Sequence, residues 1–202
     1  MEQKDSATPR LKVCAVILAA GRSTRMAPVN KLTADYQGKR LVRHAAEAAL
    51  ASKAADVLAV TGHDADAVET VLAGLDIRTV ANPDYATGLA SSVKAGIAAV
   101  PADAAGAVIL LGDMPGVTAG VIDALIDAFQ GGGGGVICQP RYDGRWGNPV
   151  LWPRGLFGEF SELSGDIGAK PLLSRHRAGI LGVDVGTDAI HMDVDAPADL
   201  KS

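Results

Sequence analysis

Short apolar runs alternate with helix-like segments along the first 140 residues. The run at 13–18 is continuous and ends at small residues, which is typical of a strand buried on both faces, and 107–111 predicts another buried strand. Further strands are predicted at 56–61, 77–81 and 136–139. Apolar positions at helical spacing between them predict helices at 41–51, 64–73, 89–100 and 118–129, with Asp64 and Thr118 as N-caps and Gly74 after a C-terminus. This order predicts an α/β fold in three layers, with helices on both faces of a mostly parallel sheet.

The alternation breaks after residue 140. The pattern predicts a polar loop at 141–147, a strand running back at 148–152, helices at 156–163 and 165–177, and strands at 180–185 and 190–194. We interpret the last sixty residues as an insertion over the sheet edge plus closing elements. The chain is then a single domain, 1–202, with a flexible N-terminus at 1–12, a flexible glycine linker at 131–135 and a substrate-side insertion at 140–178.

Composition narrows the function classes. A net charge of −4 argues against nucleic acid or an anionic membrane as the main partner. No apolar run is long enough for a membrane span, and residues 1–12 lack a signal-peptide core, so we expect a cytoplasmic protein. Cys14 and Cys138 lie in apolar runs and are expected to be small buried hydrophobic residues.

The segments after the predicted strands carry the candidate chemistry, because ligands bind beyond the carboxyl ends of such strands. After the first strand come small residues, a glycine and two cations, Arg25 and Lys31. This combination suits a phosphate, although neither G-x-x-x-x-G-K-S/T nor G-x-G-x-x-G is present. A solvated basic loop explains the residues equally well.

Acidic residues stand in two of these segments. Asp113 directly follows a buried strand, between Gly112 and Met114-Pro115, and is placed to hold a divalent metal or to serve as a simple turn carboxylate. Asp193 and Asp195 alternate on a predicted strand and would point to opposite faces. Only one of them is then expected to share a site with Asp113.

Six segments in order resemble nucleotidyltransferases that act on molybdenum cofactor, most closely the molybdopterin cytidylyltransferase branch. They span nearly the whole chain: LAAGRSTRMAPVNK at 18–31, NPDYATGLASS at 82–92, GDMP at 112–115, GRWGNPVLW at 144–152, GDIGAK at 165–170 and DVDAPADL at 193–200. The resemblance implies a nucleotide-diphospho-sugar-transferase-like, Rossmann-like fold. It also implies transfer of CMP from CTP to the terminal phosphate of molybdopterin, with release of pyrophosphate.

The resemblance also implies residue roles. Arg25 and Lys31 would hold the triphosphate and, with Asp113, form the catalytic set, and Mg²⁺ would lie on Asp113 and Asp195. The remaining nucleotide-binding residues would be Leu18, Ala19, Ala20, Gly21, Asn82, Gly88, Ser91, Ser92 and Gly112. The molybdopterin side would be formed by Gly147, Asn148, Pro149, Gly165, Asp166, Gly168 and Lys170.

Some positions depart from the family pattern. Ala27-Pro28 replaces a usual glycine, Ala196 a threonine and Lys170 an arginine, whereas Ala20 favours the cytidylyl over the guanylyl branch. The departures leave alternatives open: another nucleotide or phosphate acceptor, a chaperone that delivers the cofactor to a molybdenum hydroxylase, or an oxidoreductase.

Overall fold

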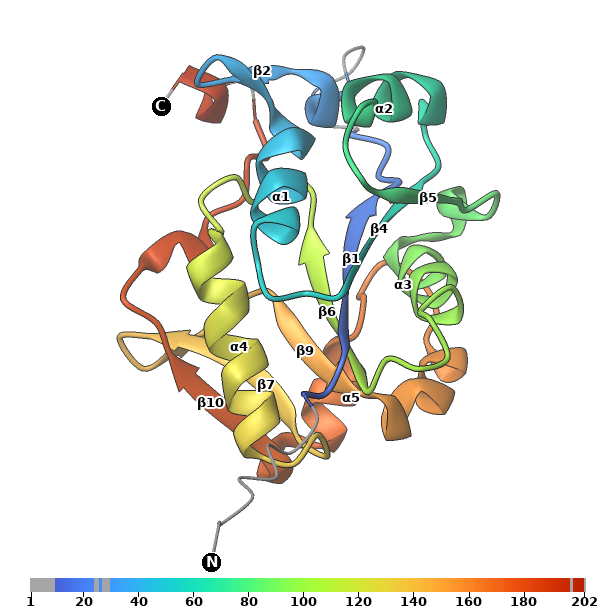
Figure 1. Ribbon diagram of the computed structural model, residues 1–202. Helices are drawn as coiled ribbons and strands as arrows, with labels where there is room; N and C mark the ends of the chain where they lie inside the picture. The colour runs from blue at the N-terminus through green and yellow to red at the C-terminus, as the bar shows by residue number, and fades with distance from the viewer. Residues whose placement is uncertain (1–9, 24–25, 27–29, 197, 202) are drawn as a thin grey trace, which may run out of the picture.

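Strand β1 (Val13–Ala19) lies in the interior of an eight-stranded sheet in the computed structural model (Figure 1). The structure describes residues 10–23, 26, 30–196 and 198–201. The other strands of the sheet are β4 (Asp56–Thr61), β5 (Arg78–Ala81), β6 (Gly106–Leu111), β7 (Ile137–Tyr142), β8 (Arg145–Trp146), β9 (Val150–Pro153) and β10 (Ile180–Asp184). The α-helices are α1 (Leu41–Leu50), α2 (Ala65–Leu72), α3 (Leu89–Ala98), α4 (Ala119–Gly131) and α5 (Lys170–Arg175).

The strand order is β10-β7-β9-β6-β1-β4-β5, with β8 attached to β7. β1, β4, β5 and β6 pair in parallel, as do β7 and β10, whereas β9 is antiparallel to both of its neighbours. The predicted α/β fold with a mostly parallel sheet is therefore confirmed. β9 comes from the segment expected over the sheet edge, and that expectation is wrong: it lies inside the sheet, because its apolar residues fill the space between β6 and β7.

Alternate residues of β1 face two separate hydrophobic cores. Val13, Ala15 and Ile17 pack toward the core that α1, α2 and α4 cover, and Cys14 and Val16 pack toward the core that α3 covers. Both faces of the strand are buried, which explains its unbroken apolar sequence. The helices thus form two layers around the sheet.

Small residues bring α3 close to the sheet. A Cβ atom added at Gly96 would lie 2.5 Å from Val16 Cγ1 and 3.1 Å from Val60 Cγ2. The glycine therefore lets the helix backbone approach β1 and β4 directly. The same helix begins at Leu89, at the carboxyl end of the sheet where ligands are expected.

Several local predictions are wrong. The glycine run ends α4 in a hydrogen-bonded turn, in which Gly133 and Gly134 donate to the carbonyls of Gln130 and Phe129, so it is a helix terminus and not a flexible linker. The predicted polar loop at 141–147 is mostly the β7–β8 hairpin. The helix predicted at 156–163 is present as a 3₁₀ helix and not as an α-helix, η4 (Arg154–Glu162). Asp64 and Thr118 stand at N-cap positions without a side-chain capping bond.

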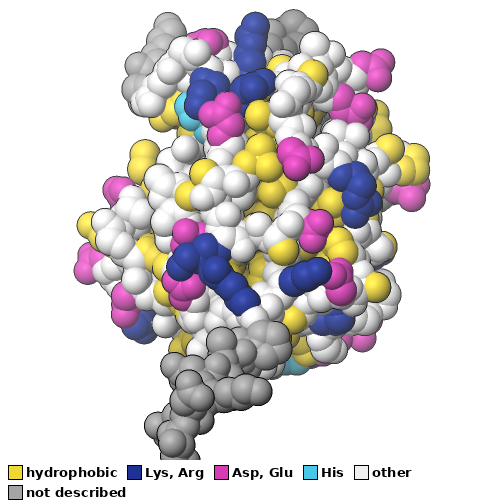
Figure 2. All heavy atoms as spheres, viewed as in Figure 1, with side chains coloured by type: hydrophobic (Ala, Val, Ile, Leu, Met, Phe, Trp, Pro, Cys, Tyr) yellow, Lys and Arg dark blue, Asp and Glu magenta, His cyan; other side chains and the backbone are white. Residues whose placement is uncertain are grey.

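Basic and acidic side chains are interspersed on the face shown in Figure 2, in keeping with the small net charge. None of the described helices is long and apolar enough to cross a membrane. Cys14 and Cys138 are buried, as predicted, and they face different cores. Burial raises the pKa of the Cys14 thiol to about 12 and that of Cys138 to about 11, so both stay protonated near neutral pH.

Candidate functional site

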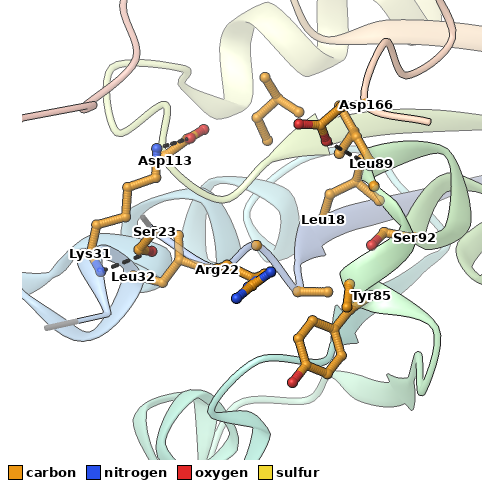
Figure 3. A pocket seen from close by; sticks show the side chains of 15 residues that line it. Leu18, Arg22, Ser23, Lys31, Leu32, Tyr85, Leu89, Ser92, Asp113 and Asp166 are labelled. Atoms are coloured by element: carbon orange, nitrogen blue, oxygen red, sulfur yellow. Dashed lines mark hydrogen bonds and ion pairs between the residues drawn. The ribbon is translucent and has the colours of Figure 1, made fainter. Parts of the chain in front are cut away.

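A cavity of about 380 Å³ opens beyond the carboxyl ends of β1 and β6 (Figure 3). Its walls come from the loop after β1, the start of α3 with the residues before it, the end of β6 with Asp113, and the segment before α5. They are lined by Leu18, Ala20, Gly21, Arg22, Ser23, Lys31, Leu32, Tyr85, Ala86, Gly88, Leu89, Ser92, Leu111, Asp113 and Asp166. Basic and acidic groups therefore gather at the sheet edge where the sequence predicted a ligand.

Short polar contacts position the loop after β1. The Asn30 side chain accepts from the backbone N–H of Leu32 at 3.0 Å and caps the short 3₁₀ helix η2 (Lys31–Thr33). Ser23 Oγ donates to Asn30 Oδ1 and accepts from the backbone N–H of Lys31, each at 3.2 Å. These bonds set the start of the Lys31 side chain. Arg25 lies outside the described residues.

Three carboxylates converge beside Lys31. One oxygen of each of Asp113, Asp193 and Asp195 lies within 4.8 Å of the others. The prediction that only one of Asp193 and Asp195 shares a site with Asp113 is wrong, because residues 192–195 form an irregular segment and not a strand. The backbone N–H of Val194 donates to the Asp113 carbonyl at 2.9 Å and fixes this segment to the end of β6.

Lys31 neutralises part of this cluster. Its Nζ lies 2.6 Å from Asp113 Oδ2 and 2.9 Å from Asp195 Oδ1, and it donates to the Val194 carbonyl. Burial lowers the pKa of Lys31, but the charges and hydrogen bonds of Asp113 and Asp195 outweigh burial and leave the pKa raised. Burial, together with the charges of Asp195 and Asp113, raises the pKa of Asp193.

The cluster fits a hard divalent cation. Asp113 Oδ1 is buried and has no hydrogen-bond partner among the described residues, a costly arrangement for a carboxylate oxygen. A cation would satisfy this oxygen and offset the repulsion among the three acids. Carboxylate oxygens are the ligands that Mg²⁺ and Mn²⁺ prefer.

The structure separates the predicted nucleotide residues into two groups. Leu18, Ala20, Gly21, Gly88 and Ser92 line the cavity with Lys31 and Asp113. The others lie behind its wall: Ala19 is fully buried, Gly112 hydrogen bonds to the Leu18 carbonyl, and Asn82 donates to the hydroxyls of Ser91 and Ser92. Asn82 and Ser91 thus shape the start of α3 and do not face the cavity.

A second cavity of about 290 Å³ adjoins the first and shares Leu18, Leu89 and Leu111 with it. Asn148, Gly168 and Lys170 of the predicted molybdopterin side line it, as does Asp193. Its remaining lining is apolar: Val93, Ile109, Val150, Trp152, Ile167, Ala169 and Leu173. Gly147 lines a neighbouring hollow, Pro149 is buried, and Gly165 lines none of these cavities.

The sequence assigned no binding role to several lining residues. Ser23 and Tyr85 lie within the segments that resemble the family, but the resemblance implies no binding role for them. The apolar residues of the second cavity have the sequence pattern of ordinary core positions. Asp166, expected on the acceptor side, lines the first cavity instead. Only the three-dimensional arrangement separates the two cavities.

Among known proteins, some resemble this chain over nearly its whole length and others over little more than half of it. A nicotine blue oxidoreductase from Paenarthrobacter nicotinovorans is 31% identical over 91% of this chain and 92% of that protein. The bifunctional protein GlmU of Leifsonia xyli subsp. xyli is 36% identical over 58% of this chain, which spans about a quarter of GlmU.

Solved structures superpose over almost the whole chain. An Rv0371c homologue from Mycobacterium sp. strain JC1 is 31% identical, with a TM-score of 0.80 and coverage of 94% and 93% of the two chains. Rv0371c of Mycobacterium tuberculosis H37Rv, solved in complex with manganese, is 28% identical, with a TM-score of 0.74 and coverage of 95% and 99%.

A CMP:2-keto-3-deoxy-manno-octonic acid synthetase complexed with CTP shares the fold, with a TM-score of 0.76 at 16% identity, and covers 94% of this chain and 95% of its own. The family model of the MobA-like NTP transferase domain matches residues 15–180. The fold, the carboxylates beside Lys31 and this match agree, and the chain belongs to the MobA-like NTP transferase family.

Proposed function

We propose that the protein transfers CMP from CTP to the terminal phosphate of molybdopterin with Mg²⁺ and releases pyrophosphate. The observation that carries the proposal is the carboxylate cluster with its orphaned Asp113 oxygen, placed with Lys31 in a nucleotide-sized cavity. A protein that only carried a finished cofactor would not need such a cluster.

In the proposed reaction, a phosphate oxygen of the acceptor attacks the α-phosphorus of CTP. A new P–O bond forms as the bond between the α-phosphorus and the bridging oxygen breaks, and pyrophosphate leaves with both electrons of that bond. The acceptor phosphate is already an anion, so a strong general base is not required. The main barrier is the approach of anions and the charge on the leaving group.

The chain's own residues address that barrier. Asp113, Asp193 and Asp195 would hold Mg²⁺, which when bound supplies charge neutralisation on the phosphates. Lys31 lies 2.6 Å from Asp113 and offers an ammonium group to the same phosphates. The loop from Leu18 to Ser23 lets the backbone approach the nucleotide closely, since Gly21 has open space where a Cβ would stand.

The second cavity supplies the acceptor side of the proposal. It reaches Asp193 of the cluster, and Lys170 places a cation on its wall for a phosphate. Its apolar surfaces, Trp152 included, suit a flat ring system better than a sugar rich in hydroxyl groups. The preference for CTP rests on Ala20, which lines the first cavity.

One observation favours a second candidate, an oxidoreductase: the 31% identity to a nicotine blue oxidoreductase over most of both chains. The apolar second cavity would also accept a flat dye. The three carboxylates count against this candidate, because hydride transfer does not need them.

Pyrophosphate release separates these functions. Wild-type protein would be incubated with Mg²⁺ and CTP, GTP, ATP or UTP, with and without molybdopterin, and product formation followed alongside pyrophosphate. We expect release with CTP that depends on molybdopterin. Asp113→Ala should reduce the rate by about 100-fold or more, by analogy with the loss of one charge-stabilising group. Asp66→Ala, which removes an exposed carboxylate from α2, is the matched control and should leave the rate unchanged.

Three outcomes would contradict the proposal. Release with another nucleotide alone would correct the donor, and no release with any nucleotide would reject transfer to this acceptor. Full activity of Asp113→Ala would reject the role of the cluster.

A further inference from the structure

Asp166 lines the first cavity and comes from the segment before α5. Figure 3 shows its carboxylate beside Leu89, across the cavity from the Lys31–Asp113 ion pair. Its neighbours Gly168 and Lys170 line the second cavity, so the chain crosses from one cavity to the other at this point. Asp166 is therefore placed to contact the nucleotide and not the acceptor.

Three hydrogen bonds hold this segment on α3. Lys94 Nζ donates to the Leu163 carbonyl at 3.1 Å, Ala90 N–H to the Gly165 carbonyl at 3.0 Å, and Leu89 N–H to Asp166 Oδ1 at 3.0 Å. Gly88 permits the contact, because its φ is +114° and a Cβ there would lie 2.5 Å from the Gly165 carbonyl. The position of the carboxylate is set before any ligand binds.

The second oxygen of Asp166 remains available. Within the described part of the chain, the hydrogen bond from Leu89 is the one that the side chain makes. Asp166 is exposed, so water satisfies its other oxygen in the free protein, and a ligand that displaces this water binds best when it offers a donor in its place.

Charge decides which end of the nucleotide meets this oxygen. With Mg²⁺ on the three carboxylates, the cation and Lys31 attract the triphosphate, whereas Asp166 repels it, so we expect the phosphates at the Lys31 end and the nucleoside at the Asp166 end. A cytidine offers two kinds of donor, the ribose hydroxyls and the amino group of the base. Building on the proposed function, we propose that Asp166 accepts a hydrogen bond from the ribose 2′-hydroxyl or from the amino group of the base and thereby selects the nucleotide.

Calorimetric titration with CTP, dCTP and UTP in Mg²⁺ tests this proposal, using wild-type protein, Asp166→Asn and the control Asp66→Asn. dCTP lacks the 2′-hydroxyl, and UTP lacks the amino donor. In Asp166→Asn the carbonyl oxygen of the new side chain can still accept from Leu89 N–H, which keeps the segment in place. The NH₂ group of that side chain replaces the free acceptor with a donor.

We expect the wild-type protein and Asp66→Asn to bind CTP at least about tenfold more tightly than one of the two analogues, as for a hydrogen bond to a charged group. In Asp166→Asn that preference for CTP should disappear or reverse. If the base is read, UTP should become the tighter ligand, and if the ribose is read, only the preference over dCTP should disappear.

A purely structural role would weaken all three nucleotides equally, and unchanged ratios in Asp166→Asn would overturn the proposal. Failure of the wild-type protein to bind any of them would reject both this inference and the proposed function. Binding of CTP with unchanged ratios would reject the inference alone.

Discussion

Lys31 connects parts of the chain that are far apart in sequence. It pairs with Asp113 after β6 and with Asp195 near the C-terminus, and it hydrogen bonds the Val194 carbonyl. The Lys31 and Asp113 side chains are only 15% and 18% exposed, so solvent screens this pair less than a surface ion pair. Without a cation, Lys31 offsets part of the charge of these acids.

Replacing Lys31 with Met should therefore destabilise the metal-free protein. We expect the free energy of unfolding to fall by about 1–3 kcal/mol, because Asp113 and Asp195 lose a charged partner. Mg²⁺ should restore more stability to this variant than it adds to the wild-type protein. Urea unfolding in EDTA and in Mg²⁺ measures both effects.

Lys53→Met is the matched control, since Lys53 pairs with Asp127 on the surface, and it should cost less than about 1 kcal/mol. Equal losses in the two variants would show that the Lys31 ion pairs are no stronger than surface ones.

Individual residues of the site differ in how far the sequence predicted them. Lys31 and Asp113 were found because they follow buried strands, whose ends are recognisable from the apolar pattern. The sequence does not predict that Asp193 joins Asp195, because the pattern of residues 190–194 is typical of a regular strand, in which the two side chains would point to opposite faces. The cavity that Asp166 faces depends on packing against α3, more than seventy positions away in sequence.

At the scale of elements, the contact of α3 with the sheet depends on a glycine. Gly96→Ala should place a methyl group 2.5 Å from Val16 Cγ1 and lower the free energy of unfolding by about 1–3 kcal/mol. In Gly120→Ala, on α4, the new methyl group meets only Thr118 Oγ1 at 3.6 Å, and the change should raise stability by about 0.5–1 kcal/mol. Urea denaturation of both variants should give effects of opposite sign. A loss of stability in both would mean that helix glycines matter here for another reason.

The α-helices and the strands of the main sheet in the first 140 residues were predictable because each is long enough to show its own pattern, whereas the two- and three-residue elements at 31–40 and 85–87 were not predicted. Those after β7 were harder, because η4, β8 and α5 are set mainly by contacts with other parts of the fold. Residues 190–194 show the reason: Ile190 accepts from the backbone N–H of Asn148, and Val194 donates to Asp113. Their apolar residues are typical of a strand, but their backbone groups form hydrogen bonds with loop residues and not with a neighbouring strand.

At the scale of the whole molecule, the carboxylate cluster links metal binding to stability. A cation bound only by the folded state at 100 times its Kd adds about 2.7 kcal/mol. For a chain of this length we expect the Tm to rise by about 5–10 °C. Thermal unfolding in MgCl₂ or MnCl₂ measures the shift, and KCl at equal ionic strength is the control. Asp113→Asn should lose most of the rise, and an equal rise in that variant would place the cation elsewhere.

The position of β9 has a consequence for the order of synthesis. β6 and β7 leave the ribosome before β9, although β9 separates them in the finished sheet. Until residues 150–153 emerge, both strands present an open edge toward the same gap, and open edges are where chains pair wrongly. Asp193 and Asp195 emerge later still. The nascent chain therefore completes its sheet and its acidic cluster only after residues 180–195 have emerged, and a chain interrupted before residue 150 would have neither.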